Sequence, residues 1–189
     1  HLIGTRRSNS SMLHLGPNIY ELFEYIPGQG YPQTLDSTFE SGKVLALYHK
    51  LLENFSTDFK PAPGSYHAAP SVDQGLKHIP RILPGAEVAN HCALLGELYT
   101  WGALRVDAMG ITDWPKQIVH ADWHPGNMLF REGRVVAVID YDSARLLPRI
   151  IDVANGVLQF SIIGGEDDVS KWPEEIDAAR FKRFIKGYD

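Results

Sequence analysis

Residues 118–130 read IVHADWHPGNMLF, and residues 135–142 read VVAVIDYD. The first segment places a polar loop between two short apolar strands, and the second is an apolar run that ends in carboxylates. We expect this arrangement to gather Asp122, Asn127 and Asp140 at one edge of a small sheet. Oxygen-bearing side chains gathered in this way form a candidate site for a hard cation such as magnesium.

The same stretch predicts a β-hairpin. Residues 128–130 and 135–139 are apolar, and the tight turn between them, residues 131–134, contains a glycine. Because residues 135–139 are continuously apolar, we expect a strand with both faces covered.

Hydrophobic periodicity predicts the remaining elements. The expected helices cover residues 36–54, 85–108, 150–162 and 177–187. The expected N-terminal strands cover residues 12–15 and 18–26. Asp36 or Ser37 is the predicted N-cap of the first helix. Residues 56–85 are rich in proline, glycine and serine, which predicts irregular structure.

Asp122, Asn127 and Asp140 together carry the groups that phosphoryl transfer from a nucleotide requires. A loop carboxylate such as Asp122 can orient a hydroxyl group and accept its proton. The amide oxygen of Asn127 and the carboxylate of Asp140 are suitable ligands for Mg²⁺. Each residue alone is typical of a turn or a cap, so the combination and its spacing carry the prediction of a kinase centre.

The segment resembles the catalytic and metal-binding motifs of the aminoglycoside phosphotransferase and choline kinase family, relatives of protein kinases. That family carries His-Gly-Asp-x-His-x-x-Asn, followed by an apolar strand that ends Ile-Asp-Phe/Tyr-x-Asp. The interval between aspartate and asparagine is also that of the protein-kinase signature His-Arg-Asp-x-x-x-x-Asn. Ala121 stands where the family usually has glycine, and the matching positions here are His120, Asp122, His124, Asn127, Ile139, Asp140, Tyr141 and Asp142.

The resemblance implies a role for each matching residue. Asp122 would be the catalytic base, and Asn127 and Asp140 would hold magnesium. The implied supporting residues are His120 under the loop backbone, His124 near the phosphates, Asp142 at a second metal or a water, and Asp152 as a structural tie to the catalytic loop. A solvent-exposed turn residue is an equal alternative for Asp142.

Residues 20–28 look like the last strand of the family's N-lobe and the hinge after it. The resemblance implies that backbone groups of Glu24 and Ile26 meet the adenine edge. The family's nucleotide-covering loop and its phosphate-contacting lysine have no counterpart before Asn18. We therefore expect a fragment of a longer protein, without full activity as given, rather than a kinase that has lost its phosphate clamp.

The expected fold is α+β and protein-kinase-like, with a partial N-terminal β lobe. Residues 1–27 would be the remnant of the N-lobe sheet and hinge. Residues 28–189 would be a mainly helical C-lobe that carries the catalytic β-hairpin, with its C-terminal end incomplete. The expected reaction transfers the γ-phosphoryl group of ATP, or GTP as an alternative donor, to a hydroxyl of a small molecule. Aminoglycosides, choline and homoserine are acceptors within the family, and residues 56–110 with the C-terminal helices would build the acceptor pocket.

Two alternatives remain open from the sequence. One is a kinase-like module that binds nucleotide without transferring phosphate. The other is a metal-dependent hydrolase with His120, Asp122 and His124 as ligands, since histidine and carboxylate at alternating positions can face one metal.

Composition limits the expected partners. The chain has 189 residues, a formal net charge of −5 and no lysine- or arginine-rich run, so we expect neither nucleic acid nor a membrane as a partner. Cys92 is the single cysteine, which excludes an internal disulfide and fits a cytoplasmic protein. The sequence does not indicate an oligomeric state.

Overall fold

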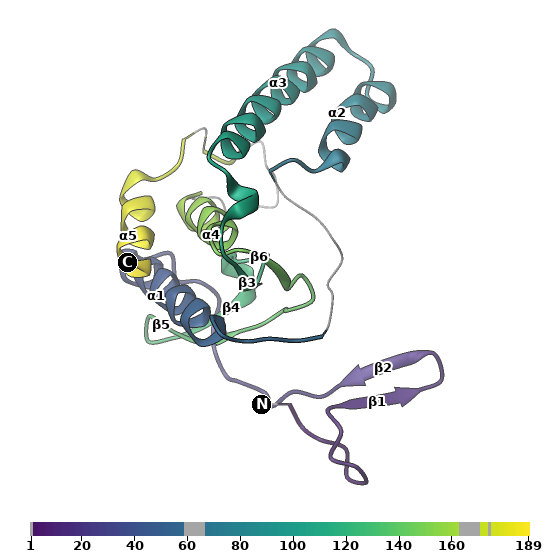
Figure 1. The fold of residues 1–189 in the computed structure, drawn as a ribbon. Helices are drawn as coiled ribbons and strands as arrows, with labels where there is room; N and C mark the ends of the chain where they lie inside the picture. The colour runs from purple at the N-terminus through teal and green to yellow at the C-terminus, as the bar shows by residue number, and fades with distance from the viewer. Residues whose placement is uncertain (1, 59–66, 163–170, 174) are drawn as a thin grey trace.

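The computed structural model describes residues 2–58, 67–162, 171–173 and 175–189 of the chain (Figure 1). Its strands are β1 (Met12–Leu15), β2 (Asn18–Glu21), β3 (Lys116–Val119), β4 (Met128–Arg131), β5 (Arg134–Val138) and β6 (Arg145–Pro148). Its helices are α1 (Leu35–Leu52), α2 (Pro70–Ile82), α3 (Ala86–Ala108), α4 (Ile150–Ser161) and α5 (Ala178–Tyr188). In the described part of the chain, no helix combines the length and the apolar character needed to cross a membrane.

The N-terminal strands form an antiparallel hairpin that stands apart from the helices in Figure 1. The predicted strand over residues 12–15 is confirmed as β1, but the one predicted over residues 18–26 ends at Glu21. All eight residues of β1 and β2 are exposed, and after Glu21 the pairing partner changes, because the N–H of Ile3 donates to the carbonyl oxygen of Leu22 at 2.7 Å. One isolated bridge, between Leu2 and Phe23, extends the pairing.

The N-cap of helix α1 lies two to three residues before the predicted caps. Thr34 is the N-cap, and its hydroxyl oxygen accepts a hydrogen bond from the backbone N–H of Ser37 at 3.1 Å. Asp36 and Ser37, the predicted caps, therefore lie inside the first turn. Threonine serves here because its side-chain oxygen satisfies an N–H that would otherwise lack a partner.

Helix α2 contradicts the prediction of irregular structure over residues 56–85, although residues 59–66 of that range lie outside the described part. Pro70 begins the helix, where the missing N–H of proline has no cost. The helix also tolerates Pro80 near its end, and none of its residues is buried. Its support comes from α3, which lies beside it (Figure 1) and matches the predicted helix over residues 85–108.

The hydrophobic core lies where α1, α4 and α5 meet the β4–β5 hairpin. The fully buried apolar side chains of this core, among the described residues, are Leu45, Trp123, Met128, Phe130, Phe160 and Phe184. Glycines let α1 and α5 approach closely: a Cβ built on Gly42 would lie 2.2 Å from the carbonyl oxygen of Phe184. Because Trp123 belongs to the loop that carries Asp122, that loop is anchored in the core.

The strands do not form the single small sheet that we expected. β3 pairs antiparallel with β6, and β4 pairs antiparallel with β5, in two separate ladders. The sequence did not predict β6, which ends in proline and pairs with a strand about thirty residues away. Pairing at such a separation is set by the packed fold rather than by local pattern.

The predicted hairpin over residues 128–139 is confirmed. Its turn residues Glu132 and Gly133 have φ values of 53° and 76°, the combination of a two-residue type I′ turn. β5 is half-buried or exposed along its length and Ile139 after it is 42% exposed, so the expectation of a strand covered on both faces was wrong. One face of the hairpin lies on the core, and the other does not.

Candidate active site

Asp122 and Asn127 are in direct contact. The Asn127 amide nitrogen donates hydrogen bonds to the Asp122 carboxylate oxygen Oδ2 and to the Asp122 backbone carbonyl, both at 3.0 Å. Asn127 is buried, whereas the Asp122 side chain is partly exposed. Because the amide nitrogen is used inside the loop, the amide oxygen Oδ1 of Asn127 is available to a cation.

The backbone of the loop is unusually constrained. Ala121 has φ of 64°, the left-handed region that side chains with a Cβ rarely occupy. A single 3₁₀ turn, Pro125–Asn127, follows, and the Nδ1 atom of His124 accepts the N–H of Gly126 at 3.0 Å. This turn reverses the chain so that Asn127 comes back onto Asp122. Glycine, usual in the resembling family at position 121, would adopt this φ without strain.

A backbone hydrogen bond connects the segment that carries Asp140 to Asn127. The N–H of Ile139 donates to the carbonyl oxygen of Asn127 at 2.9 Å, so Asp140 is the residue directly after that contact. Asp140 itself has φ of 65°, a conformation that aspartate tolerates better than most residues. Backbone strain of this kind is found preferentially at functional sites. Here Ala121 and Asp140, two strained positions, lie beside the candidate catalytic and metal-binding groups.

Asp152 connects α4 to the loop. Its carboxylate is fully buried and accepts the backbone N–H groups of His120 at 2.8 Å and of Ala121 at 2.7 Å. The ring of His49, on α1, contacts the same carboxylate through Nε2 at 3.0 Å, and its Nδ1 contacts the Tyr188 hydroxyl at 2.9 Å. The loop backbone before Asp122 is therefore held by a hydrogen-bonded chain that reaches α5.

His120 and His124 occupy different environments. His120 is fully buried, and its Nε2 atom lies 3.1 Å from the carbonyl oxygen of Ile139. It thus joins the loop to the end of the β4–β5 hairpin. His124 is partly exposed and its Nε2 atom lies 3.3 Å from the Asp122 carboxylate, with which it forms an ion pair when protonated.

An aromatic cluster supports the segment that contains Asp140. The ring of Tyr141 stacks on Tyr48 with centroids 6.4 Å apart and tilts against His120 at 5.1 Å. The Tyr141 hydroxyl donates to the carbonyl of Val138 at 3.0 Å. Burial raises the pKa of Tyr48 far above its usual value, with a further contribution from the charge of Asp152, and burial also raises the pKa of Tyr141. Both phenols therefore stay neutral. Asp142, the other candidate supporting residue, is exposed just beyond this cluster.

Glu24 and Ile26 lie between β2 and the start of the helical region. Glu24 is exposed and Ile26 is half-buried. Just after them, Gln29 and Phe130 exchange two backbone hydrogen bonds, of 2.9 and 2.8 Å. The segment predicted to be the hinge therefore runs directly into contact with β4, the strand that Asn127 precedes.

The described residues contain no group of three or more histidine, cysteine, aspartate or glutamate side chains placed to hold a metal. This observation counts against the hydrolase alternative, which needs His120, Asp122 and His124 around one ion. A magnesium site made of Asn127 and Asp140 would take its other ligands from phosphates and water, as is usual for this ion. The residues present therefore fit a nucleotide-bound magnesium ion.

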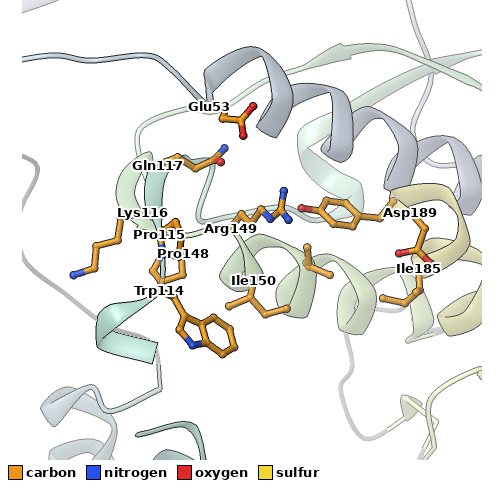
Figure 2. Close-up of a pocket in the computed structure, with 12 residues that line it drawn as sticks. Glu53, Trp114, Pro115, Lys116, Gln117, Pro148, Arg149, Ile150, Ile185 and Asp189 are labelled. Atoms are coloured by element: carbon orange, nitrogen blue, oxygen red, sulfur yellow. The ribbon is translucent and has the colours of Figure 1, made fainter. Parts of the chain in front are cut away.

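One cavity lies at the loop, and another lies beside β3, α4 and α5. One, of about 510 Å³, includes Asp122 among its lining residues. The other, of about 640 Å³, includes Lys116, Arg149 and Asp189, and Figure 2 shows these side chains around it. This second cavity contains none of the residues that the sequence singled out. The sequence did not predict which residues line either cavity, because each cavity is lined by residues from several separate elements.

The profile of the family described as "Phosphotransferase enzyme family" (APH) matches residues 5–189. No curated protein matches the chain significantly.

Three solved structures illustrate the similarity. An amicoumacin kinase, hAmiN, in complex with AMP-PNP, Ca²⁺ and Ami, is 16% identical with a TM-score of 0.57, over 96% of this chain and 53% of that one. The spectinomycin phosphotransferase APH(9)-Ia, in complex with ADP and spectinomycin, is 15% identical with a TM-score of 0.57, over 99% of this chain and 57% of that one. A gentamicin–APH(2")-IIa complex is 17% identical with a TM-score of 0.51, over 94% and 57%.

The chain thus spans little more than half the length of these structures, and at this identity they show the fold alone. That fold is protein-kinase-like, with a partial N-lobe, as the sequence predicted. The match of the family profile covers nearly the whole chain. The chain belongs to the phosphotransferase enzyme family.

Proposed function

We propose that this chain carries the catalytic centre of an ATP-dependent kinase that phosphorylates a hydroxyl group of a small molecule. The observation that supports this most strongly is the contact of Asn127 with the Asp122 carboxylate, with Asp140 joined to Asn127 through Ile139. Phosphoryl transfer needs a base and two hard ligands in one place, and these contacts support such a grouping. Membership of the family supports phosphotransferase chemistry in general.

In this mechanism Asp122 accepts a hydrogen bond from the acceptor hydroxyl and orients its oxygen toward the γ-phosphorus atom. The oxygen forms a bond to phosphorus while the bond from phosphorus to the β,γ-bridging oxygen breaks. The hydroxyl proton passes to Asp122, and ADP leaves. Asn127 and Asp140 would hold Mg²⁺, which supplies positive charge against the phosphate oxygens when bound.

The other assignments belong to the same proposal. Backbone groups of Glu24 and Ile26 would meet the adenine edge, with GTP as the alternative donor. His124, beside Asp122, would face the phosphates, while His120 and Asp152 hold the loop and Asp142 assists from outside it. Residues 1–27 would act as the N-lobe remnant and hinge, and residues 28–189 as the C-lobe. A cytoplasmic location, where ATP is supplied, completes the proposal.

The test replaces Asp140 by asparagine in the full-length protein. Asparagine also tolerates a positive φ, so Asp140→Asn removes the charge without adding backbone strain. We expect the Mg²⁺-dependent part of ATP affinity, measured by calorimetric titration with and without the ion, to fall by about 10-fold or more. Asp73→Asn, on the exposed surface of α2, is the matched control and should bind as the wild type does.

Unchanged magnesium dependence in Asp140→Asn would contradict its assignment as a ligand. Normal magnesium-dependent ATP binding, with no transfer to any hydroxyl acceptor, would instead favour the non-catalytic binding module.

A further inference from the structure

The cavity of about 510 Å³ that Asp122 lines has the volume of a small-molecule site. It is bordered by the end of α3, the segment after it, the catalytic loop and α4. A molecule held there can bring a hydroxyl to the Asp122 carboxylate. The cavity therefore lies where the phosphoryl acceptor of the proposed reaction would bind.

The wall of this cavity is apolar. Its described lining residues are all apolar except His67, Asp122 and Asn155. Trp114 donates its indole N–H to the carbonyl oxygen of Met109 at 3.1 Å, so its one polar group is already used inside the protein. The ring of Trp114 then offers only apolar surface to a ligand.

Among the residues that the structure describes, acidic groups are scarce around the same space. Asp122 is the one carboxylate among the described lining residues. Asp107, which follows the lining residue Val106, is paired with His67 through a contact of 2.9 Å between Oδ1 and Nε2. An acceptor with several ammonium groups would need several carboxylates here, because burying unpaired charge against apolar walls is costly.

Asn155 supplies the remaining polar contact. Its amide nitrogen donates to the carbonyl oxygen of Trp123 at 3.4 Å, which leaves the amide oxygen as an acceptor for a ligand. We propose that the phosphoryl acceptor is an uncharged alcohol with a largely apolar body, which presents its hydroxyl to Asp122 and a second polar group to Asn155. This inference rests on the proposed function, since it concerns the acceptor of that reaction.

The experiment uses the full-length protein and 1-pyrenebutanol, an uncharged fluorescent alcohol with an apolar ring system. Fluorescence titration measures its affinity for the wild type, for Leu158→Glu in the cavity wall and for Leu98→Glu on α3 outside it. The two leucines are similarly exposed, 46% and 55%, so both variants should fold. We expect saturable binding that weakens about 10-fold or more in Leu158→Glu, since burial of one leucine is worth roughly that factor. Leu98→Glu should bind as the wild type does.

Gentamicin, a polycation, should not displace the probe. The inference is overturned if binding is not saturable, if both variants weaken it equally, or if gentamicin displaces the probe and binds more tightly to Leu158→Glu. Magnesium-dependent ATP binding is measured on the same proteins and does not involve Leu158. If none of these proteins showed magnesium-dependent ATP binding, the phosphotransferase proposal would be overturned. The titrations with the fluorescent alcohol would still show whether the cavity binds an uncharged, apolar ligand.

Discussion

The β4–β5 hairpin and the β1–β2 hairpin are built alike but lie in different surroundings. Each has strands of four or five residues, and each turn contains a glycine with positive φ, Gly133 in one and Gly16 in the other. Met128 and Phe130 of β4 are buried in the core, whereas every residue of β1 and β2 is exposed.

The difference shows that local pattern makes a hairpin and packing makes it rigid. An isolated two-stranded hairpin is marginally stable in water, so β4–β5 owes its order to the core beneath it. The candidate metal ligands both lie at the open end of this hairpin, opposite its turn, since Asn127 precedes β4 and Asp140 follows β5. A hairpin that packs on the core holds such groups more accurately than an exposed hairpin could.

The largest effect is expected where α4 secures the loop before the β4–β5 hairpin. Asp152→Ala leaves the N–H groups of His120 and Ala121 and the ring of His49 without their buried acceptor. We expect the free energy of unfolding to fall by about 3–5 kcal/mol in urea denaturation. Asp36→Ala, which breaks the exposed ion pair with Arg183, should cost no more than about 1 kcal/mol. Equal losses in the two variants would show that the buried hydrogen bonds of Asp152 stabilise the fold no more than an exposed ion pair does.

The second prediction compares two methionines that begin the two hairpins. Met128 is 1% exposed and Met12 is 45% exposed. Met128→Ala leaves a cavity in the core and should lower the free energy of unfolding by about 2–5 kcal/mol. Met12→Ala should change it by no more than about 0.5 kcal/mol. Thermal or urea denaturation of both variants checks this, and a large effect of Met12→Ala would mean that β1–β2 is covered in the intact protein.

The smallest effect is expected at the turns. A Cβ on Gly16 or Gly133 would meet no atom within 4 Å, so alanine at either position adds only the strain of positive φ, about 1 kcal/mol. We expect Gly133→Ala to lower global stability by that amount. Gly16→Ala should leave global stability unchanged and speed amide exchange in β1 and β2 alone, because that hairpin opens locally. Faster exchange confined to β4 and β5 in Gly133→Ala would contradict this distinction.

The sequence predicted the structural features that depend on residues close together in the chain. The bounds of α3, the β4–β5 hairpin and the N-terminal strand β1 follow from local periodicity and turn chemistry. The contact of Asp122 with Asn127 also lies within reach of local reasoning, because one 3₁₀ turn separates them.

What the sequence did not predict depends on distant partners. β6 exists because β3 pairs with it, and α2 is supported by α3 despite its two prolines. The chain of contacts from Tyr188 through His49 to Asp152 joins three helices far apart in sequence. Each of these features requires the packed fold before it can be recognised.

Hydrogen bonds join the predicted hinge segment to β4. Gln29 is paired with Phe130, and the side chain of Arg131 donates to the carbonyl oxygen of Pro27 at 2.6 Å. On the other side, Phe23 is bridged to Leu2 within the N-terminal region. Residues 24–26 thus connect a segment held by β4 to a segment paired within the N-terminal region. The residues proposed to meet adenine would therefore sit directly beside a segment that β4 supports, so the proposed base contact and the proposed phosphate site would share one hairpin as their foundation.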